Sequence, residues 1–342
     1  MGPAEKPPSE PFNRGSEAIA GKMILPHSPS KPVRKISWHQ IFLYISLLFL
    51  LVGLYRADYL KVPKIYSPML IAASFSALFG GFVLTVAAWR KILLLSGVKV
   101  DFAQCAAGMG LSIFGKYIPG KIWMVLGRVL YLPADSRVPL SRLSHISLND
   151  QFMTLWVGFA LGGAGLLFVN GIGIWGLSML GFWSLLSVLL LSKNAHRALH
   201  WLMRKFMKAD KTFEPLKLTV IAALLPWYVS FWVLWSAAFF FFVGALSEAA
   251  GSWRVAFGFP MSAALGIIAV ISPGGIGARE GAMAGYLTLC GFPLSQAATI
   301  SVASRLWFLF GELFLFTLGY WADRRLKKHA AIHFFRNIAG KR

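Results

Sequence analysis

The feature that most constrains this chain is a set of six predominantly apolar stretches, each close to the length that crosses a bilayer. About 20 helical residues are needed to span roughly 30 Å of hydrocarbon. The stretches cover approximately residues 39–56, 67–89, 145–169, 173–192, 216–246 and 296–321. With 57% hydrophobic and 14% charged residues, the chain is also far more apolar than a soluble domain. The sequence therefore predicts an all-α polytopic membrane protein.

Positive charge is concentrated outside these stretches. The chain has 34 Lys and Arg but only 13 Asp and Glu, and the basic residues crowd into 1–37, 193–217 and 324–342. Basic segments beside spanning helices stay on the cytoplasmic side. We therefore expect a multi-pass protein of the bacterial inner (cytoplasmic) membrane with both termini in the cytoplasm, although Lys61 and Lys64 would then lie in an external loop. No basic module is long enough to bind nucleic acid.

These patterns divide the chain into three parts. Residues 1–37 mix prolines with charges and lack hydrophobic periodicity, so we expect a disordered basic cytoplasmic tail. The transmembrane domain is expected over 38–323, and a second basic cytoplasmic tail over 324–342. Within the domain, the linker 193–215 alternates apolar and basic residues, which predicts an amphipathic helix lying on the inner surface.

Two further apolar regions, 102–132 and 255–291, are interrupted by Gly and Pro near their centres. At about 1.5 Å per residue, their arms are too short to cross a bilayer. We expect two re-entrant hairpins, and the count of spans makes them enter from opposite sides. Opposed broken elements of this kind are typical of inverted repeats in transporters.

The hairpin tips are the predicted site, because non-helical backbone at membrane depth must be buried in protein or line a wet cavity. Half-helices starting near Gly120 and Gly277 would direct free amides at an anion. Ionisable residues inside membrane segments are costly and usually functional. The candidate residues for binding an anionic headgroup are Lys116, Gly120, Lys121, Arg128, Gly274, Gly275, Gly277, Arg279, Glu280 and Arg305, with Asp150 and Glu312 as ion-pair partners.

Less specific interpretations of the same residues stay open. The acidic and basic groups could simply neutralise one another, since Arg305 and Glu312 share a helix face. Lys116 and Lys121 could extend to the membrane surface. The sequence from Gly115 to Lys121 spells G-x-x-x-x-G-K, but Ile122 replaces the Ser or Thr of a nucleotide-binding loop. We expect no metal site, no cofactor and no catalytic constellation, so the chain is not expected to be an enzyme.

Two motifs carry a family resemblance. The first runs from Gly115 through Pro119-Gly120-Lys121 to Gly127-Arg128, and the second is Pro273-Gly274-Gly275-Ile276-Gly277-Ala278-Arg279-Glu280-Gly281, with Arg305 on the last helix. The chain from about 38 to 325 resembles the transmembrane region of lysylphosphatidylglycerol synthases. That resemblance implies a flippase-like, lipid-handling module. Without the aminoacyl-transferase domain of the full-length synthases, it implies no synthesis of lysyl-lipid.

One departure from the family pattern affects the lipid. Many relatives carry an acidic-basic pair where this chain has Asn149-Asp150-Gln151, so the headgroup could differ.

Together these observations favour an inner-membrane lipid transporter. It would bind a phospholipid or polyprenyl-phosphate between the two hairpins, with Arg128, Arg279 and Arg305 on the phosphate and Glu280 orienting Arg279. One alternative is a non-transporting partner that docks a glycosyltransferase or other lipid enzyme. Another is an enzyme acting on lipid phosphates, for which only Glu280, Asp150 and Glu312 could serve as base. The sequence leaves a homodimer open.

Overall fold

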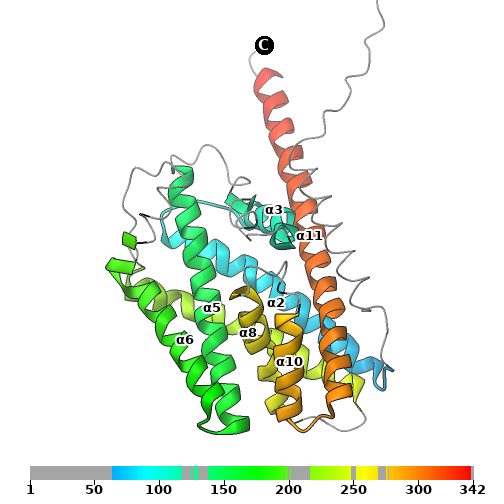
Figure 1. Ribbon diagram of the computed structural model, residues 1–342. Helices are drawn as coiled ribbons and strands as arrows, with labels where there is room; N and C mark the ends of the chain where they lie inside the picture. Colours follow the sequence, from blue (N-terminus) through cyan, green and yellow to red (C-terminus); the bar gives the residue numbers. More distant parts are fainter. Residues whose placement is uncertain are drawn as a thin grey trace, which may run out of the picture. The chain divides into compact units, whose positions relative to one another are not determined.

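The chain is built from helices. The structure, a computed structural model, describes residues 64–117, 124, 127–129, 138–195, 197–198, 201, 216–247, 252–268, 275 and 277–339. Within these ranges it contains α-helices and short 3-10 helices and no strand. The all-α prediction is therefore confirmed (Figure 1).

Five helices in the described part of the chain are long and apolar enough to cross a membrane. They are α2 (Pro68–Leu95), α5 (Leu140–Asn170), α6 (Ile174–Leu191), α8 (Leu218–Leu246) and α11 (Leu294–Ala339). Even α6, with 18 residues, is about 27 Å long at 1.5 Å per residue. The protein is thus a multi-pass membrane protein. These helices match five of the six predicted spans, and the sixth, at 39–56, lies outside the described residues.

Local sequence signals set the ends of these helices. The hydroxyl of Ser67 accepts a hydrogen bond from the amide of Leu70, 3.4 Å away, and Pro68 occupies the first turn of α2, where its missing N–H is not needed. At the far end of α5, Gly171 takes φ of +65°, which a glycine adopts without strain. Such signals place the helix ends in the short polar loops that connect the spans.

One backbone and one side-chain hydrogen bond show in which direction neighbouring helices run relative to one another. The amide of Tyr66 donates to the carbonyl of Ala245 over 2.8 Å, which joins the start of α2 to the end of α8. Arg142 Nη2 donates to the carbonyl of Ser96 over 3.1 Å and joins the end of α2 to the start of α5. Therefore α2 and α8 are antiparallel, and the chain returns into α5 on the side where α2 ends.

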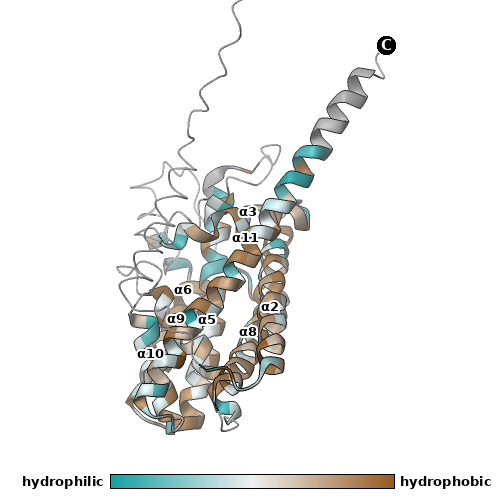
Figure 2. Cartoon of the chain, turned by 90° about the vertical axis from the view of Figure 1, so that its right-hand side faces the viewer, coloured by the Kyte–Doolittle hydropathy of each residue, from teal (hydrophilic) through white to brown (hydrophobic). Residues whose placement is uncertain are grey.

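Many of the side chains exposed on the spanning helices are large and hydrophobic. Figure 2 shows hydrophobic residues along α2 and α8 and hydrophilic residues toward the end of α11. On α6 the exposed side chains include Trp175, Leu177 and Leu185, each more than half exposed. Exposed apolar surface of this extent is typical of a lipid-facing helix.

The two interrupted regions form short helices. The first contains α3 (Phe102–Ser112) and the 3-10 helix η1 (Ile113–Tyr117). The second contains η2 (Trp253–Phe257), α9 (Gly258–Ile268) and α10 (Ala278–Leu289), and α9 packs against α10. None of these reaches the length needed to span. The turns at 118–123 and 269–274 lie outside the described residues, so re-entrance and opposite entry stay predictions, as does the inverted repeat.

A glycine contact holds α3 against the last helix. A Cβ added at Gly319 would lie 2.7 Å from the carbonyl oxygen of Ala106 and 2.8 Å from the Cα of Gly110. Only glycine lets the two backbones approach this closely, as in other membrane helix pairs. The close approach positions η1, which follows α3, beside the middle of α11.

Candidate functional site

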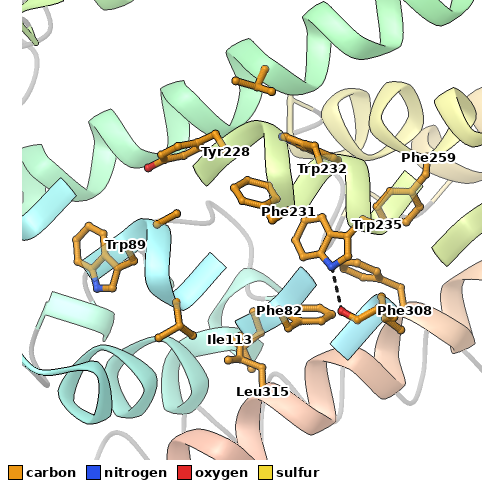
Figure 3. Packing of buried hydrophobic residues seen from close by; sticks show 14 of the residues in the cluster. Phe82, Trp89, Ile113, Tyr228, Phe231, Trp232, Trp235, Phe259, Phe308 and Leu315 are labelled. Carbon is orange, nitrogen blue, oxygen red and sulfur yellow. Dashed lines mark hydrogen bonds between the residues drawn. The ribbon is translucent and has the colours of Figure 1, made fainter. Parts of the chain in front are cut away.

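A cavity of about 310 Å³ lies among α2, α3, η1, α5, α8, α9, α10 and α11. Most of its lining is hydrophobic, and α8 contributes Phe231, Trp232 and Trp235. Figure 3 shows these rings packed close to Phe82 of α2 and Phe308 of α11. Trp235 Nε1 donates to the carbonyl of Leu78 over 3.3 Å, which is the dashed line in that view. A cavity of this kind suits the apolar part of an amphipathic molecule.

Four basic side chains predicted from the sequence line this cavity together. They are Lys116, Arg128, Arg279 and Arg305, and Asp150 lines it as well. Each cation comes from a different part of the chain: η1, the segment 127–129, α10 and α11. The fold thus gathers the candidate residues that the two interrupted regions and the last helix supply.

Arg128 is held tightly in an ion pair. Its Nη1 donates to Asp150 Oδ2 over 2.6 Å, while Nε and Nη2 donate to the hydroxyl and carbonyl of Ser147 over 2.5 and 2.9 Å. The guanidinium also stacks 4.4 Å from the centroid of the Trp89 ring. Asp150 accepts a further hydrogen bond of 2.5 Å from the Tyr228 hydroxyl. Arg128 therefore binds protein acceptors with all three of its nitrogens.

Lys116 is directed at Glu312 of α11. The ammonium Nζ lies 2.5 Å from Glu312 Oε1, and the Tyr117 hydroxyl donates to Oε2 over 2.7 Å. The Lys116 side chain is 21% exposed, whereas the Glu312 side chain is 2% exposed. Lys116 is thus an internal ion-pair partner in this structure rather than a lysine extended to the surface. Glu312, which shares a helix face with Arg305, takes its cation from η1.

Among the described residues, the Glu280 carboxylate has two close polar contacts, and neither is with Arg279. As the third residue of α10, it reaches back so that Oε2 accepts from the Gly277 amide over 2.6 Å, which is a helix-capping contact. Its Oε1 lies 3.5 Å from Arg305 Nη1. The expectation that Glu280 orients Arg279 is therefore not met, because α10 packs on α11 and presents Glu280 to Arg305. The Gly277 amide is used by the protein itself.

Arg279 is a buried cation whose guanidinium has few partners in the described part of the chain. Its residue is 7% exposed, and its Cζ lies 5.1 Å from the Phe259 ring centroid and 4.8 Å from that of Phe308. Its Nε and Nη2 have no hydrogen-bond partner among the described residues. Buried polar atoms are nearly always satisfied. Within the described ranges, Arg279 therefore brings two buried N–H donors to the cavity without a protein acceptor for either.

The glycine-rich motif is only partly described. Gly275 has φ of +72°, and a Cβ there would lie 2.6 Å from the carbonyl oxygen of Gly266 on α9. Glycine is therefore required at 275 both for its conformation and for close packing. Gly120, Lys121 and Gly274 lie outside the described residues. In the described ranges, no group of three His, Cys, Asp or Glu side chains could hold a metal ion.

Three buried aromatic partners were not predicted from the sequence. Tyr117 and Tyr228 each donate to a buried carboxylate, and Trp89 stacks on a guanidinium. For Tyr228 the sequence did contain a signal. A tyrosine within a predicted apolar span needs a hydrogen-bond partner for its hydroxyl. Sequence spacing alone does not say which carboxylate that partner is.

Comparison with known proteins gives one family match. The model of the family described as "Lysylphosphatidylglycerol synthase TM region" matches residues 38–316, which is most of the chain. No curated protein and no solved structure matches the chain.

Proposed function

The chain belongs to the lysylphosphatidylglycerol synthase transmembrane-region family, and we propose from this premise that it binds an anionic lipid headgroup and moves the lipid between leaflets. The cavity lined by Arg279 is the proposed headgroup site. The lipid would be a phospholipid or a polyprenyl-phosphate, both of which join a phosphate to apolar chains.

The observation that carries this proposal is the state of Arg279. Guanidinium binds phosphate oxygens through paired N–H donors, and such charge-assisted hydrogen bonds are stronger than neutral ones. Arg128 already uses its nitrogens on Asp150 and Ser147, whereas Nε and Nη2 of Arg279 lack protein partners among the described residues. Of the two, Arg279 is therefore the proposed phosphate ligand, and Arg128 is assigned to holding the surrounding helices.

Two neighbouring cations support the same site. Lys116 Nζ lies 5.4 Å from the Phe308 ring centroid, the ring that Arg279 also flanks. Arg305 Cζ and Lys116 Nζ lie 5.7 and 5.5 Å from the Tyr117 ring centroid. A phosphate on Arg279 would thus lie near two further cations, whose charges Glu312 and Glu280 partly balance, in a cavity whose apolar walls strengthen the attraction.

The surrounding fold supports a path through the membrane. The helices α3, α9 and α10 are too short to span, and short helices are tolerated at membrane depth where they are buried in protein or line a cavity. We infer that they belong to re-entrant hairpins that meet at the cavity. Broken helices beside a central site are typical of transporters that alternate their access.

We infer the orientation from the basic residues at one end of the described spans. Near the end of α2 lie Arg90 and Lys91, and Lys99 follows that helix. Arg142 lies at the start of α5, and Lys193 follows α6. The chain order of the spans brings all of these to the same membrane face. By the positive-inside rule this face is cytoplasmic, and a first span at 39–56 would place both termini there.

The test is translocation of a fluorescent phosphatidylglycerol in vesicles reconstituted with the purified protein. Arg279→Ala should lower the rate about 10- to 100-fold, because a hydrogen bond to a charged group is worth roughly 1.5–3 kcal/mol. Arg279→Lys keeps the charge without the planar donors and should fall between. The matched control is Arg254→Ala on η2, which removes an exposed arginine outside the cavity lining.

Equal rates for wild type and Arg279→Ala, with both proteins folded, would contradict the site. If neither protein transports lipid and a lipid enzyme co-purifies with both, the results would instead favour a non-transporting docking role.

A further inference from the structure

We propose that Gln151 of α5 determines headgroup specificity: its side-chain amide binds the hydroxyl groups of a phosphodiester headgroup whose phosphate lies on Arg279. The inference rests on the proposed function, since it requires an anionic headgroup in the cavity. It also narrows that function, because a glycerol-type phospholipid carries such hydroxyls and a polyprenyl-phosphate carries none.

Aromatic rings join the two polar ends of the cavity, which are lined by Arg279 of α10 and Gln151 of α5. Arg279 Cζ lies 4.8 Å from the Phe308 ring centroid, and that ring lies 5.3 Å from the Trp235 ring. Trp235 is 5.5 Å from Trp232, whose Nε1 donates over 3.0 Å to a backbone carbonyl on the next turn of α5 after Gln151. Figure 3 shows Trp235 between Trp232 and Phe308. A headgroup with its phosphate on Arg279 can therefore extend along these rings to α5.

The charges at the two ends orient the headgroup. At the α5 end, Asp150 and Arg128 neutralise each other, with Oδ2 and Nη1 2.6 Å apart. At the other end, Arg279 keeps two N–H donors without a protein acceptor in the described part of the chain. A phosphate would bind at the Arg279 end, because the Asp150 carboxylate repels it. The uncharged part of the headgroup would then lie against α5.

The amide of Gln151 has hydrogen-bonding capacity left for a ligand. Within the described ranges its side chain makes one hydrogen bond, from Nε2 to Asp150 Oδ2 over 3.4 Å. An ionised carboxylate only accepts hydrogen bonds, so the NH₂ group faces Asp150 and the carbonyl Oε1 is left for another donor. The second N–H of the amide is also left. An acceptor and a donor side by side match two adjacent hydroxyls, of which one donates and the other accepts.

Three hydroxyl side chains in the cavity lining favour the same kind of ligand. Thr85, Ser112 and Thr154 each donate a hydrogen bond of 2.7 to 2.8 Å to a backbone carbonyl of their own helix. Their protons are thus used, and toward a ligand their oxygens act as acceptors. Hydroxyls on the headgroup supply donors for such oxygens, whereas an alkyl group leaves them unpaired. A site built to hydrogen-bond a hydroxyl discriminates strongly against an analogue that lacks it.

Binding of two dioctanoyl phospholipids to the full chain in detergent, measured by titration calorimetry, tests this specificity. Phosphatidylglycerol and phosphatidylpropanol have the same charge, the same acyl chains and the same number of headgroup carbons. Phosphatidylpropanol lacks both headgroup hydroxyls. Wild type should bind phosphatidylglycerol about 10- to 100-fold more tightly, as two hydrogen bonds between uncharged groups predict.

Substitutions separate the two ends of the site. Gln151→Leu should lose most of this preference by binding phosphatidylglycerol more weakly, and should bind phosphatidylpropanol as wild type does. Arg279→Ala should weaken both ligands equally, because both carry the phosphate. The matched control is Gln296→Leu, which removes a half-buried glutamine of α11 outside the cavity lining and should keep the wild-type preference. If Gln151→Leu fails to fold, Gln151→Met, which is closer in shape, replaces it.

The outcomes separate the two proposals. Equal binding of both lipids by wild type overturns the recognition of hydroxyls and leaves the headgroup site standing. A Gln151→Leu variant that keeps the full preference, or that weakens both lipids alike, overturns the role of Gln151, since an amide with a purely structural role would not distinguish the ligands. No binding of either lipid by wild type overturns the headgroup site and the specificity together.

Discussion

Removing the guanidinium of Arg128 should destabilise the protein more than removing any exposed arginine. Its three hydrogen bonds to Asp150 and Ser147 measure 2.5–2.9 Å, and both charged side chains are at most 7% exposed. In Arg128→Met, Asp150 would keep the Tyr228 hydroxyl as its close donor. Breaking a buried pair in this way costs about 3–5 kcal/mol. At roughly 2–4 °C per kcal/mol, Tm should fall by about 6–20 °C.

The assay is thermal unfolding in detergent at a fixed scan rate, followed by tryptophan fluorescence. A fixed rate matters because membrane proteins of this size commonly unfold irreversibly. Arg142→Met is the matched control, since Arg142 is exposed and its side chain makes one hydrogen bond among the described residues, of 3.1 Å to the carbonyl of Ser96. Its Tm should change by less than about 2 °C, as expected for a surface substitution.

A double substitution sharpens the test. Arg128→Met combined with Asp150→Leu removes both charges, and an apolar replacement of a buried pair is often close to neutral. The double variant should therefore unfold at a higher temperature than Arg128→Met alone. A single variant no less stable than Arg142→Met, or a double variant no better than the single one, would refute the assignment of Arg128 to a desolvated structural pair.

Two glycine substitutions test the packing around the cavity in the same unfolding assay. Gly275→Ala should lower Tm, because a Cβ would lie 2.6 Å from the Gly266 carbonyl and the positive φ alone costs about 1–3 kcal/mol. Gly319→Ala should lower it by forcing α11 away from Ala106 of α3, with overpacking costs of about 1–3 kcal/mol. Gly285→Ala is the control for both, since its added Cβ would have no heavy atom within 4 Å, and a control as unstable as either variant would contradict the packing argument.

The spans could be predicted because length and apolarity together are nearly diagnostic for a membrane helix. The ends were less predictable. Helix α5 begins at Leu140, five residues before the predicted start, through a polar stretch that includes Arg142 and Ser144. The Ser144 side chain is buried by neighbouring helices and not by lipid, which a hydropathy criterion cannot detect. Helix α2 likewise continues past the predicted end, through Arg90 and Lys91, to Leu95.

The candidate residues could be predicted for a related reason, since a charge within an apolar segment is rare unless it has a role. Their pairing could not. Helical spacing suggested Arg305 for Glu312, yet the close contact of α3 with α11 brings Lys116 to it instead. Glu280 turns to Arg305 because α10 packs along α11. Partner choice follows from contacts between distant segments, which the sequence pattern of one helix does not contain.

The double role of Glu280 has a mechanical consequence. One carboxylate closes the first turn of α10 at Gly277 and also faces Arg305 on α11. A shift of α10 along its axis would loosen the turn and the ion pair in the same movement, so the beginning of α10 and the first third of α11 should move together. A displacement of α10 that separates Glu280 from Arg305 should therefore also release the amide of Gly277 and loosen the first turn of the helix.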